Sequence, residues 1–571
     1  MKRYSAAVIL GQLNHNNSEL VRGIISQAQK LDCNISVFYV FSECEDEIPH
    51  QSGEEQLYSK INFDVYDGVI FEDAEIWTDR MREKIIDILN RKCHVPVVRI
   101  CSDPSDNIGF RSFCVSSRKH FSELVSHLID VHDLHKIYCL AGTRGNFTSD
   151  ERTEGYKDAM RAHGLEAGED CIFDGDFWVD AAARLGKAIG TGSVERPEAV
   201  VCVNDYSAVS LINTLARYDI RIPEDIAVTG FDAVIDSMLS IPTVTTYLFP
   251  NIQAGQKCFM RLFNLISDRH IHEPEIGSGK LICNRSCGCG RSDSAFVTKH
   301  KNLIVSRQKY SEKFESGNMN ERLMSAADIN ELVDAIDSLT YLINGFRRYV
   351  LCVYNPSDTG KITVLLDKNE GSDTAKYLSV SSDDLEVSLL RDREESHILF
   401  YSPVHFNEQF LGFSIIEYDI DFEILSGVYR LWNKNISDAL MYLKKYSENG
   451  LSCVTHGCIP VWMRDVMREM DKPENFIEGL PRLLELSHMS QEHITREFRR
   501  YTGLSPTQHI NSLRLSYAAG LLDAAKEPIT QICYMSGFNN LGYFYKRFRE
   551  KYGCSPGRYL SLHKNTKCRS Q

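Results

Sequence analysis

The sequence contains no long uninterrupted apolar run. Its 571 residues are 43% apolar, but no segment approaches the roughly 20 apolar residues that a helix needs to cross a bilayer. The first apolar run, residues 6–10, stops at Gly11-Gln12 and is too short for the core of a secretion signal. We therefore expect a soluble cytoplasmic protein that makes no membrane contact.

The sequence also lacks the usual marks of nucleotide-dependent enzymes. No Gly-x-Gly-x-x-Gly follows the first predicted strand, and there is no P-loop lysine. The 18 cysteines are scattered through apolar stretches and do not form the framework of a small secreted domain. We expect free thiols, as in a reducing compartment. We therefore predict that the protein is not an enzyme and that it needs no cofactor or metal.

Three cysteines do fall close together, at Cys283, Cys287 and Cys289. Three ligands at this spacing fall short of a closed zinc site, and no histidine partner is evident nearby in the sequence. A structural strand end is the favoured interpretation, with a metal-binding or thiol-sensing role as the alternative. A looser group, Cys453, His456 and Cys458, leaves the same alternatives open.

Negative charge dominates the chain but is unevenly distributed. The net charge is −14, yet residues 461–571 contain 17 Lys and Arg against 11 Asp and Glu, a net charge of about +6. The remaining residues therefore carry about −20. This asymmetry is typical of a DNA-binding tail attached to an acidic sensor.

Two helix-turn-helix patterns stand in tandem at residues 479–506 and 528–556. Each has a short helix, a tight turn and a second helix with one apolar and one polar face, and each ends in Gly, one residue, then Ser-Pro. In the first pattern Ser490 is a good N-cap, and Ile494 and Phe498 are four residues apart on one stripe. Gly503 is placed for a left-handed C-cap, and Pro506 prevents continuation of the helix.

In the second pattern Asn540 is the predicted cap, and Phe544 and Phe548 form the inward stripe. The outward faces of the two second helices could then meet base edges and phosphates. Those outward residues are Glu492, Thr495, Arg496 and Arg499 in the first helix, and Leu541, Gly542, Tyr545, Lys546 and Arg549 in the second.

Residues 461–564 closely resemble the AraC/XylS family of transcription regulators. The resemblance implies two subdomains joined by a helix around residues 514–522, with both recognition helices entering successive major-groove segments. Carried over by position, the base-reading residues are Glu492, Thr495, Arg496, Leu541, Gly542, Tyr545 and Lys546. Two departures are Cys533-Tyr534, where the family usually has a small alanine, and Gly542 inside the second recognition helix. A residue without a side chain reads no base, so we expect more sequence information from the first helix.

The first 290 residues alternate strand and helix signals. Short apolar runs predict buried parallel strands, with amphipathic segments between them, and this pattern indicates an open α/β architecture that binds ligands at the carboxyl ends of its strands. The predicted strands are residues 6–10, 35–41, 68–71, 95–100, 136–141, 199–203 and 226–231.

This region resembles the regulatory domains of LacI/GalR-type proteins and their periplasmic sugar-binding relatives. The matching phrases lie, in the family's order, at residues 152–160, 174–177, 203–208, 221–232 and 241–246. The resemblance implies two hinged lobes that close on a small ligand. By position, Arg152, Asn204 and Asp232 correspond to residues that hold sugar hydroxyls, and Phe177 to an aromatic wall.

Simpler roles for these polar residues remain open. Asp232 could serve simply as the cap of the following helix, and Asn204-Asp205 could simply form a strand-to-helix turn, with no role in ligand binding. The first predicted strand begins six residues into the chain, so the DNA-reading headpiece usual in that family is not expected. The C-terminal domain would supply DNA binding instead, an arrangement that resembles xylose-type activators.

The middle of the chain carries weaker signals. After a linker helix at residues 291–325, the pattern predicts a helix at 326–343, strands at 348–354, 362–366, 398–404 and 412–418, and a helix at 429–446. This order resembles a GAF-like sensory domain with a core of its own. One side of the last helix carries an apolar stripe, which could form a dimer interface or cover the sheet. The stripe residues are Leu431, Ile436, Leu440 and Leu443.

The sequence thus predicts a multidomain protein. It has a two-lobed α/β periplasmic-binding-protein-like domain (1–290), a linker helix (291–325), an α+β GAF-like domain (326–450) and an all-α double helix-turn-helix domain (460–565). We predict that the protein is a homodimeric transcription regulator of carbohydrate metabolism. It would bind double-stranded DNA at an operator and sense a small sugar-like effector. Contact with RNA polymerase is compatible with that function.

Two alternatives belong to other classes. One is a DNA-binding regulator that senses metal or redox state through cysteines. The other is a DNA-repair-type methyl-accepting protein, which needs a four-cysteine zinc site or an activated thiol with base partners. Neither feature is visible in the sequence.

Overall fold

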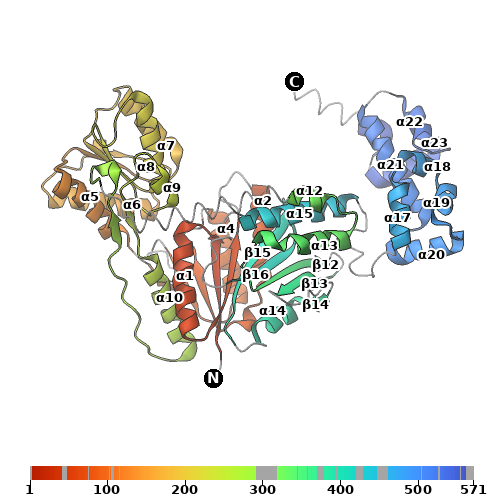
Figure 1. Cartoon of the computed structure of the whole chain (residues 1–571), viewed down its shortest axis with the longest axis horizontal. Coiled ribbons are helices and arrows are strands. Elements are labelled where there is room, and N and C mark those ends of the chain that lie inside the picture. Colours follow the sequence, from red (N-terminus) through yellow and green to blue (C-terminus); the bar gives the residue numbers. More distant parts are fainter. Residues whose placement is uncertain are drawn as a thin grey trace. The chain divides into compact units, whose positions relative to one another are not determined.

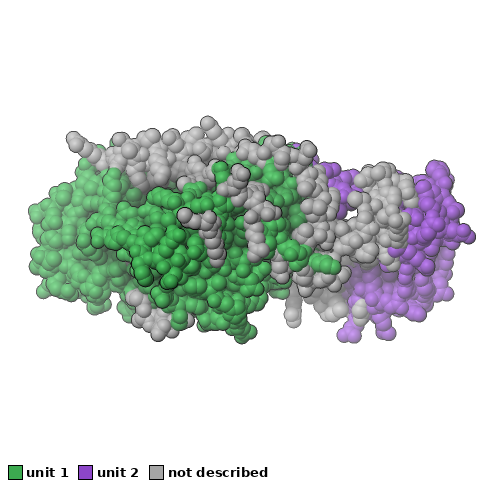
Figure 2. Space-filling view, turned by 90° about the horizontal axis from the view of Figure 1, so that it is seen from below, with its two compact units in different colours: residues 1–320, 337–354, 360–438 green, residues 321–336, 355–359, 439–571 purple. Residues whose placement is uncertain are grey.

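The computed structural model resolves the chain into two compact units (Figure 2). One comprises residues 1–320, 337–354 and 360–438, and the other residues 321–336, 355–359 and 439–571. Among the described residues, none of the helices is both long and apolar enough to cross a membrane. The structure describes residues 3–41, 48–74, 76, 78–101, 103, 109–114, 116–290, 318–343, 345–355, 358–369, 378–391, 395–418, 428–446, 461–502, 504–524, 527–552 and 554–560.

The first lobe is built on five parallel strands, which confirms the four strands predicted there. Its central strands are buried along nearly their whole length, as expected for parallel strands covered on both faces. In sheet order they are β2 (Asn34–Val40), β1 (Ser5–Gln12), β3 (Gly68–Glu72), β4 (Val97–Ile100) and β5 (Arg111–Phe113). The helical segments of this lobe are α1 (His15–Lys30), α2 (Ile48–Glu54), α3 (Gln56–Ser59), η2 (Phe63–Val65) and α4 (Asp79–Lys92).

Helix α10 (Asn251–Ser267) returns to this lobe and packs against α1. Glycines allow the two backbones to approach closely. A Cβ atom on Gly23 would lie 2.1 Å from the Ile252 carbonyl oxygen, and one on Gly255 would lie 2.0 Å from that of Leu20. Any larger residue at either position would push the helices apart.

The second lobe has its own parallel sheet, which confirms the predicted strands at 136–141, 199–203 and 226–231. The strand order is β7 (Ile172–Phe173), β6 (Ile137–Leu140), β8 (Ala199–Cys202) and β9 (Ala227–Thr229). Two helix pairs flank the sheet, each packed on a separate apolar cluster. One pair is α5 (Arg118–His132) with α6 (Phe147–Ala162), and the other is α7 (Val179–Gly190) with α8 (Asp205–Leu215).

Short elements complete the second lobe. The segments between its strands form η3 (Glu169–Cys171), η4 (Ala216–Tyr218) and α9 (Ile235–Leu239). Strand β10 (Thr246–Leu248) pairs antiparallel with β11 (Lys280–Ile282), which leads into η5 (Arg285–Cys287). The chain thus returns to the second lobe after α10.

The middle region adds five mainly antiparallel strands to the sheet of the first lobe (Figure 1). Strand β15 pairs with β2 in parallel, so the sheet has ten strands. At the seam the Ile35 amide donates to the His397 carbonyl at 2.8 Å, and the rings of Phe38 and Tyr401 stack 4.4 Å apart. The added strands, in sheet order, are β14 (Leu378–Ser381), β13 (Asp358–Asn369), β12 (Arg348–Asn355), β16 (Gln409–Glu417) and β15 (Ile398–Phe406).

The strands predicted in the middle region are confirmed, but the expectation of a separate core is wrong. One apolar cluster contains Phe38 and Phe71 of the first lobe together with Val350 and Ile415 of the added strands. The two regions share a core because β15 completes the hydrogen bonding of β2. The likeness to a GAF domain stays a prediction.

Helices of the middle region are α12 (Met319–Met324), α13 (Ile329–Leu339), η6 (Thr340–Ile343), α14 (Ser382–Arg391) and α15 (Val428–Tyr446). The start of α15 covers the sheet: Trp432 Nε1 donates to the Tyr349 hydroxyl at 3.1 Å, and Asn433 Nδ2 to Ser402 Oγ at 3.2 Å. Leu431 is 44% exposed, so its assignment to the apolar stripe is wrong, and buried Trp432 takes that place. Most of the predicted linker helix, 291–317, lies outside the described residues.

In the part that the structure describes, the C-terminal region is all helical, as predicted. Two apolar clusters form its cores, one around Ile494 and Phe498 and the other around Phe544 and Phe548. Its helices are α17 (Val461–Met470), α18 (Pro473–Glu478), α19 (Leu480–Ser487), α20 (Gln491–Thr502), α21 (Pro506–Ala524), α22 (Ile529–Met535) and α23 (Leu541–Tyr552).

Candidate functional site

Arg152 and Asp232 meet at the carboxyl edge of the second-lobe sheet. Arg152 projects from α6, and its Nη2 and Nη1 atoms donate to the two carboxylate oxygens of Asp232 at 2.8 and 3.3 Å. Nη1 also donates to the Val203 carbonyl at 2.6 Å, and the guanidinium lies 4.2 Å from the centre of the Phe231 ring. The sequence predicted both residues as ligand contacts but did not predict that they bind each other.

The backbone sets the direction of Asp232. Its φ angle is 92°, and that of Ala233 is 55°. Both values lie in the left-handed region that L-residues seldom adopt, and strain of this kind is concentrated at functional positions. Helix α9 begins at Ile235 with Val234 in the cap position, so Asp232 does not cap it.

Asn204 does act as a helix cap. Its side-chain oxygen accepts a hydrogen bond from the Ser207 amide at 3.0 Å, at the start of α8. Its Nδ2 atom donates to the Phe177 carbonyl at 2.8 Å. The amide therefore fixes two loops at the sheet edge, and one N–H of Nδ2 remains for another partner.

The aromatic residues at this edge are more numerous than the sequence predicted. Phe177 has a φ angle of 61°, and its half-buried ring lies against Gly142, where a Cβ would meet the ring at 2.4 Å. The next residue, Trp178, is 42% exposed, and its ring centre lies 5.6 Å from that of Tyr206. Trp178 adjoins Phe177 in the sequence, and Tyr206 lies two residues after Asn204, so proximity to the predicted residues could have identified both.

Asp205 lies next to this carboxyl edge of the sheet and is fully buried. Burial raises the pKa of its carboxyl well above the ordinary value, and the nearby Asp232 carboxylate raises it further. One of its oxygens accepts from the Val234 amide at 2.8 Å. Asp205 therefore positions the loop that carries Asp232.

Helix α20 has the two faces that the sequence predicted. Ile494 and Phe498 are fully buried, and Ser490 caps the helix by accepting from the His493 amide at 3.3 Å. Glu492, Arg496 and Arg499 are exposed and Thr495 is half-buried. The Arg496 side chain is 70% exposed and contacts only residues of its own helix, Glu497 at 3.2 Å and His493 at 3.0 Å, among the described contacts.

Helix α23 follows the same plan with different side chains. Asn540 caps it by accepting from the Tyr543 amide at 2.8 Å, and Phe544 and Phe548 are fully buried. Gly542, Tyr545, Lys546 and Arg549 are exposed. Leu541 is half-buried against the second core, so its prediction as an outward residue is only partly met.

Arg514 of α21 ties the two helix-turn-helix units together. Its Nε and Nη2 atoms donate to the carbonyls of Phe476 and Ile477 at 2.8 and 2.7 Å. One glycine from each unit leaves room for it: Cβ atoms on Gly479 and Gly537 would lie 2.6 and 2.8 Å from the guanidinium, and both glycines have a φ of 82°. Gly479 and Gly537 thus make room for the same arginine.

The repeated Ser-Pro phrase begins helices as well as ending them. Ser505 Oγ accepts from the Gln508 amide at 3.3 Å, and the Gln508 side chain accepts from the Ser505 amide at 2.8 Å. Ser555 Oγ likewise accepts from the Arg558 amide at 3.4 Å. These are N-caps with proline in the first turn. The predicted C-cap at Gly503 lies outside the described residues.

Two stretches of the chain match known families. Residues 125–287 match the periplasmic binding protein-like domain, and residues 483–561 match a helix-turn-helix domain. The chain thus joins a periplasmic-binding-protein-like domain to a helix-turn-helix domain, the arrangement that its resemblance to LacI/GalR-type and AraC/XylS-type regulators predicted. The four predicted effector residues lie in the matched part of the sensor, and both recognition helices lie in the helix-turn-helix domain.

Curated relatives resemble the sensor. The transcriptional repressor PurR of Vibrio atlanticus is 30% identical over 210 residues, which are 37% of this chain and 60% of that repressor. PurR of Vibrio cholerae is 35% identical over 141 residues, 25% of this chain and 41% of that repressor. The chain thus spans at most about 60% of the length of these repressors.

Solved structures of low sequence identity also match half of the chain. The complex of the transcriptional regulator CelR with cellobiose is 18% identical, with a TM-score of 0.40, covering 50% of this chain and 85% of that one. The lac repressor dimer bound to operator is 19% identical, with a TM-score of 0.40, covering 50% and 94%.

Proposed function

We propose that this protein is a sequence-specific transcription regulator that binds double-stranded DNA through α20 and α23. The observation that carries the proposal is the pair of recognition helices held on one framework by Arg514. Each helix buries its apolar stripe and exposes a polar face, the form that fits a major groove. The net charge of about +6 in residues 461–571 favours phosphate contacts.

The sensor domain takes a small polyhydroxylated effector in this proposal. Arg152 supplies donors, Asp232 supplies acceptors, and Asn204 has an amide hydrogen available. Hydroxyl groups of a sugar can both accept from the guanidinium and donate to the carboxylate. Phe177, Trp178 and Tyr206 offer ring faces on which the C–H surface of a sugar packs.

A thermal-shift screen of the full chain against a panel of sugars tests the effector proposal. A ligand that binds only the folded protein raises the melting temperature. We expect at least one sugar to raise it for the wild type and for Asp236→Ala, whose exposed carboxylate lies on α9. Asp232→Ala should show no shift. A shift that survives in Asp232→Ala would place the effector elsewhere.

We further propose that the regulator acts as a homodimer on two half-sites, because one pair of recognition helices reads an asymmetric sequence. Contact with RNA polymerase would follow from binding beside a promoter. Light scattering at micromolar concentration tests the dimer. A monomer both with and without operator DNA would remove this part of the proposal.

The methyl-accepting alternative finds less support. Cys533 lies in the DNA-binding domain, where it is fully buried. Burial raises the pKa of its thiol, which is the opposite of nucleophile activation. Every cysteine that the structure describes is a free thiol.

A further inference from the structure

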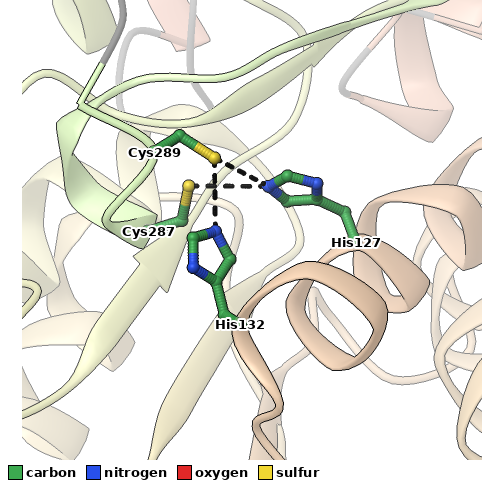
Figure 3. A group of neighbouring side chains, drawn as sticks. All are labelled: His127, His132, Cys287 and Cys289. Carbon is green, nitrogen blue, oxygen red and sulfur yellow. Dashed lines mark hydrogen bonds between the residues drawn. The ribbon is translucent and has the colours of Figure 1, made fainter.

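Two histidines and two cysteines converge where the sensor's last described strand ends (Figure 3). His127 and His132 lie in the final turns of α5. Cys287 ends η5, and Cys289 follows it after Gly288, which has a φ of 96°. The positive φ reverses the chain, so the two cysteines flanking the glycine face the same helix. The sequence shows no histidine close to these cysteines, and the fold brings two from more than 150 positions away.

The donor atoms are close enough to share one ion. Cys289 Sγ lies 3.2 Å from His132 Nε2 and 3.3 Å from His127 Nε2, and Cys287 Sγ lies 3.6 Å from His127 Nε2. One ligand atom from each residue lies within 4.8 Å of the others. Tetrahedral zinc, with bonds of about 2.3 Å to sulfur and about 2.0–2.1 Å to nitrogen, separates its sulfur and nitrogen ligands by roughly 3.5 Å. The observed spacings match that value.

We propose that His127, His132, Cys287 and Cys289 form a structural zinc site. Four protein ligands close the coordination sphere, which is typical of structural sites, whereas catalytic zinc keeps one position open. On binding, each thiol loses its proton to solvent and becomes a thiolate ligand, and each imidazole coordinates through Nε2 in its neutral form. No redox step is involved.

The segment that carries the two cysteines is already fixed in place on one side. Its Ser286 hydroxyl accepts a hydrogen bond from the Thr245 amide at 2.8 Å. Zinc would add a second anchor, to α5, at the point where the sequence leaves the sensor toward the rest of the protein.

Cys283 defines the limit of the site. Its sulfur lies 3.8 Å from His127 Nε2, but it is not among the four residues whose donors are all mutually close. We therefore assign it no ligand role. Thiol–imidazole hydrogen bonding without a metal would give similar contacts, and the experiment must separate these two states.

The test is the zinc content of the full chain, purified without a polyhistidine tag and analysed by mass spectrometry of the metal. We expect about one zinc per chain for the wild type. His132→Gln and Cys289→Ser should lose most of it. Matched controls should retain it: His135→Gln, an exposed histidine just beyond α5, and Cys93→Ser, a half-buried thiol of the first lobe.

Two further measurements guard against variants that misfold. Replacement of zinc by cobalt in the wild type should give the absorption bands of tetrahedral thiolate coordination. Chelation should then make the half-buried Cys289 reactive toward an alkylating reagent, as mapped by peptide mass spectrometry, while circular dichroism shows a folded protein. A wild type that binds neither zinc nor cobalt, or a Cys289→Ser variant that binds zinc as the wild type does, overturns the proposal.

Discussion

Arg152 in the sensor and Arg496 on the first recognition helix place the same guanidinium group in opposite surroundings. The Arg152 side chain is 11% exposed and is fixed by Asp232 and by the Val203 carbonyl. The Arg496 side chain is 70% exposed, and its described partners lie on its own helix. A fixed, buried charge selects a ligand of one shape, whereas an exposed charge can exchange its partners when base edges arrive. Substitutions should therefore act differently at the two sites.

The largest effect is expected from Asp232→Ala. The change leaves Arg152 in its buried position without its carboxylate, so effector affinity should fall by about 2–4 kcal/mol. Isothermal titration calorimetry with the sugar found by thermal shift measures this loss. Asp236→Ala is the control and should bind as the wild type does. An unchanged affinity in Asp232→Ala would mean that the buried pair plays no part in recognition.

Arg514→Met should have the next largest effect, on stability. It leaves the Phe476 and Ile477 carbonyls without their donor and opens space beside Gly479 and Gly537. Unsatisfied buried groups cost about 1–3 kcal/mol of unfolding free energy. Urea denaturation monitored by circular dichroism measures the loss. Arg549→Met, an exposed change on α23, should stay within about 0.5 kcal/mol of the wild type.

Arg496→Ala should weaken binding to the preferred DNA sequence by about 1–3 kcal/mol and relax the preference at one base position. Its exposed guanidinium is free to leave Glu497 and His493 for a base edge. Binding assays on specific and random duplexes of equal length measure both effects. An equal loss of affinity for the two duplexes would show that Arg496 contacts phosphate and does not read a base.

The smallest effect is expected from Arg549→Ala. This exposed residue near the end of α23 should contact phosphate, so its loss should weaken binding to all sequences alike. The slope of log affinity against log salt concentration should fall in magnitude by about 1, since one fewer counterion is displaced. A loss confined to one sequence would instead make Arg549 a base-reading residue.

Local periodicity explains what the sequence could predict. The stripes Ile494 with Phe498 and Phe544 with Phe548 are buried as expected, because a four-residue spacing fixes one face of a helix. The helix caps Ser490 and Asn540 could also be predicted, because each bonds to an amide only three residues along the chain. Leu431 shows the limit of such reasoning, since its neighbour Trp432 fills the buried position instead.

Features that depend on distant pairing could not be predicted. The pairing of β15 with β2 joins residues more than 350 positions apart, and nothing in the sequence of either strand indicates which strand it pairs with. The His127 and Cys289 contact spans 162 positions, so sequence spacing could not reveal it. Arg152 and Asp232 were predicted singly, but their ion pair required the fold.

The central claim is that effector binding in the sensor controls DNA binding by α20 and α23. The direct test is the affinity of the full chain for a duplex selected from a random library, measured by fluorescence anisotropy with and without the effector. We predict a change in operator affinity of roughly 5–150-fold on adding effector, absent in Asp232→Ala. Binding no tighter than to random DNA, or an operator affinity that the effector leaves unchanged, would contradict the account.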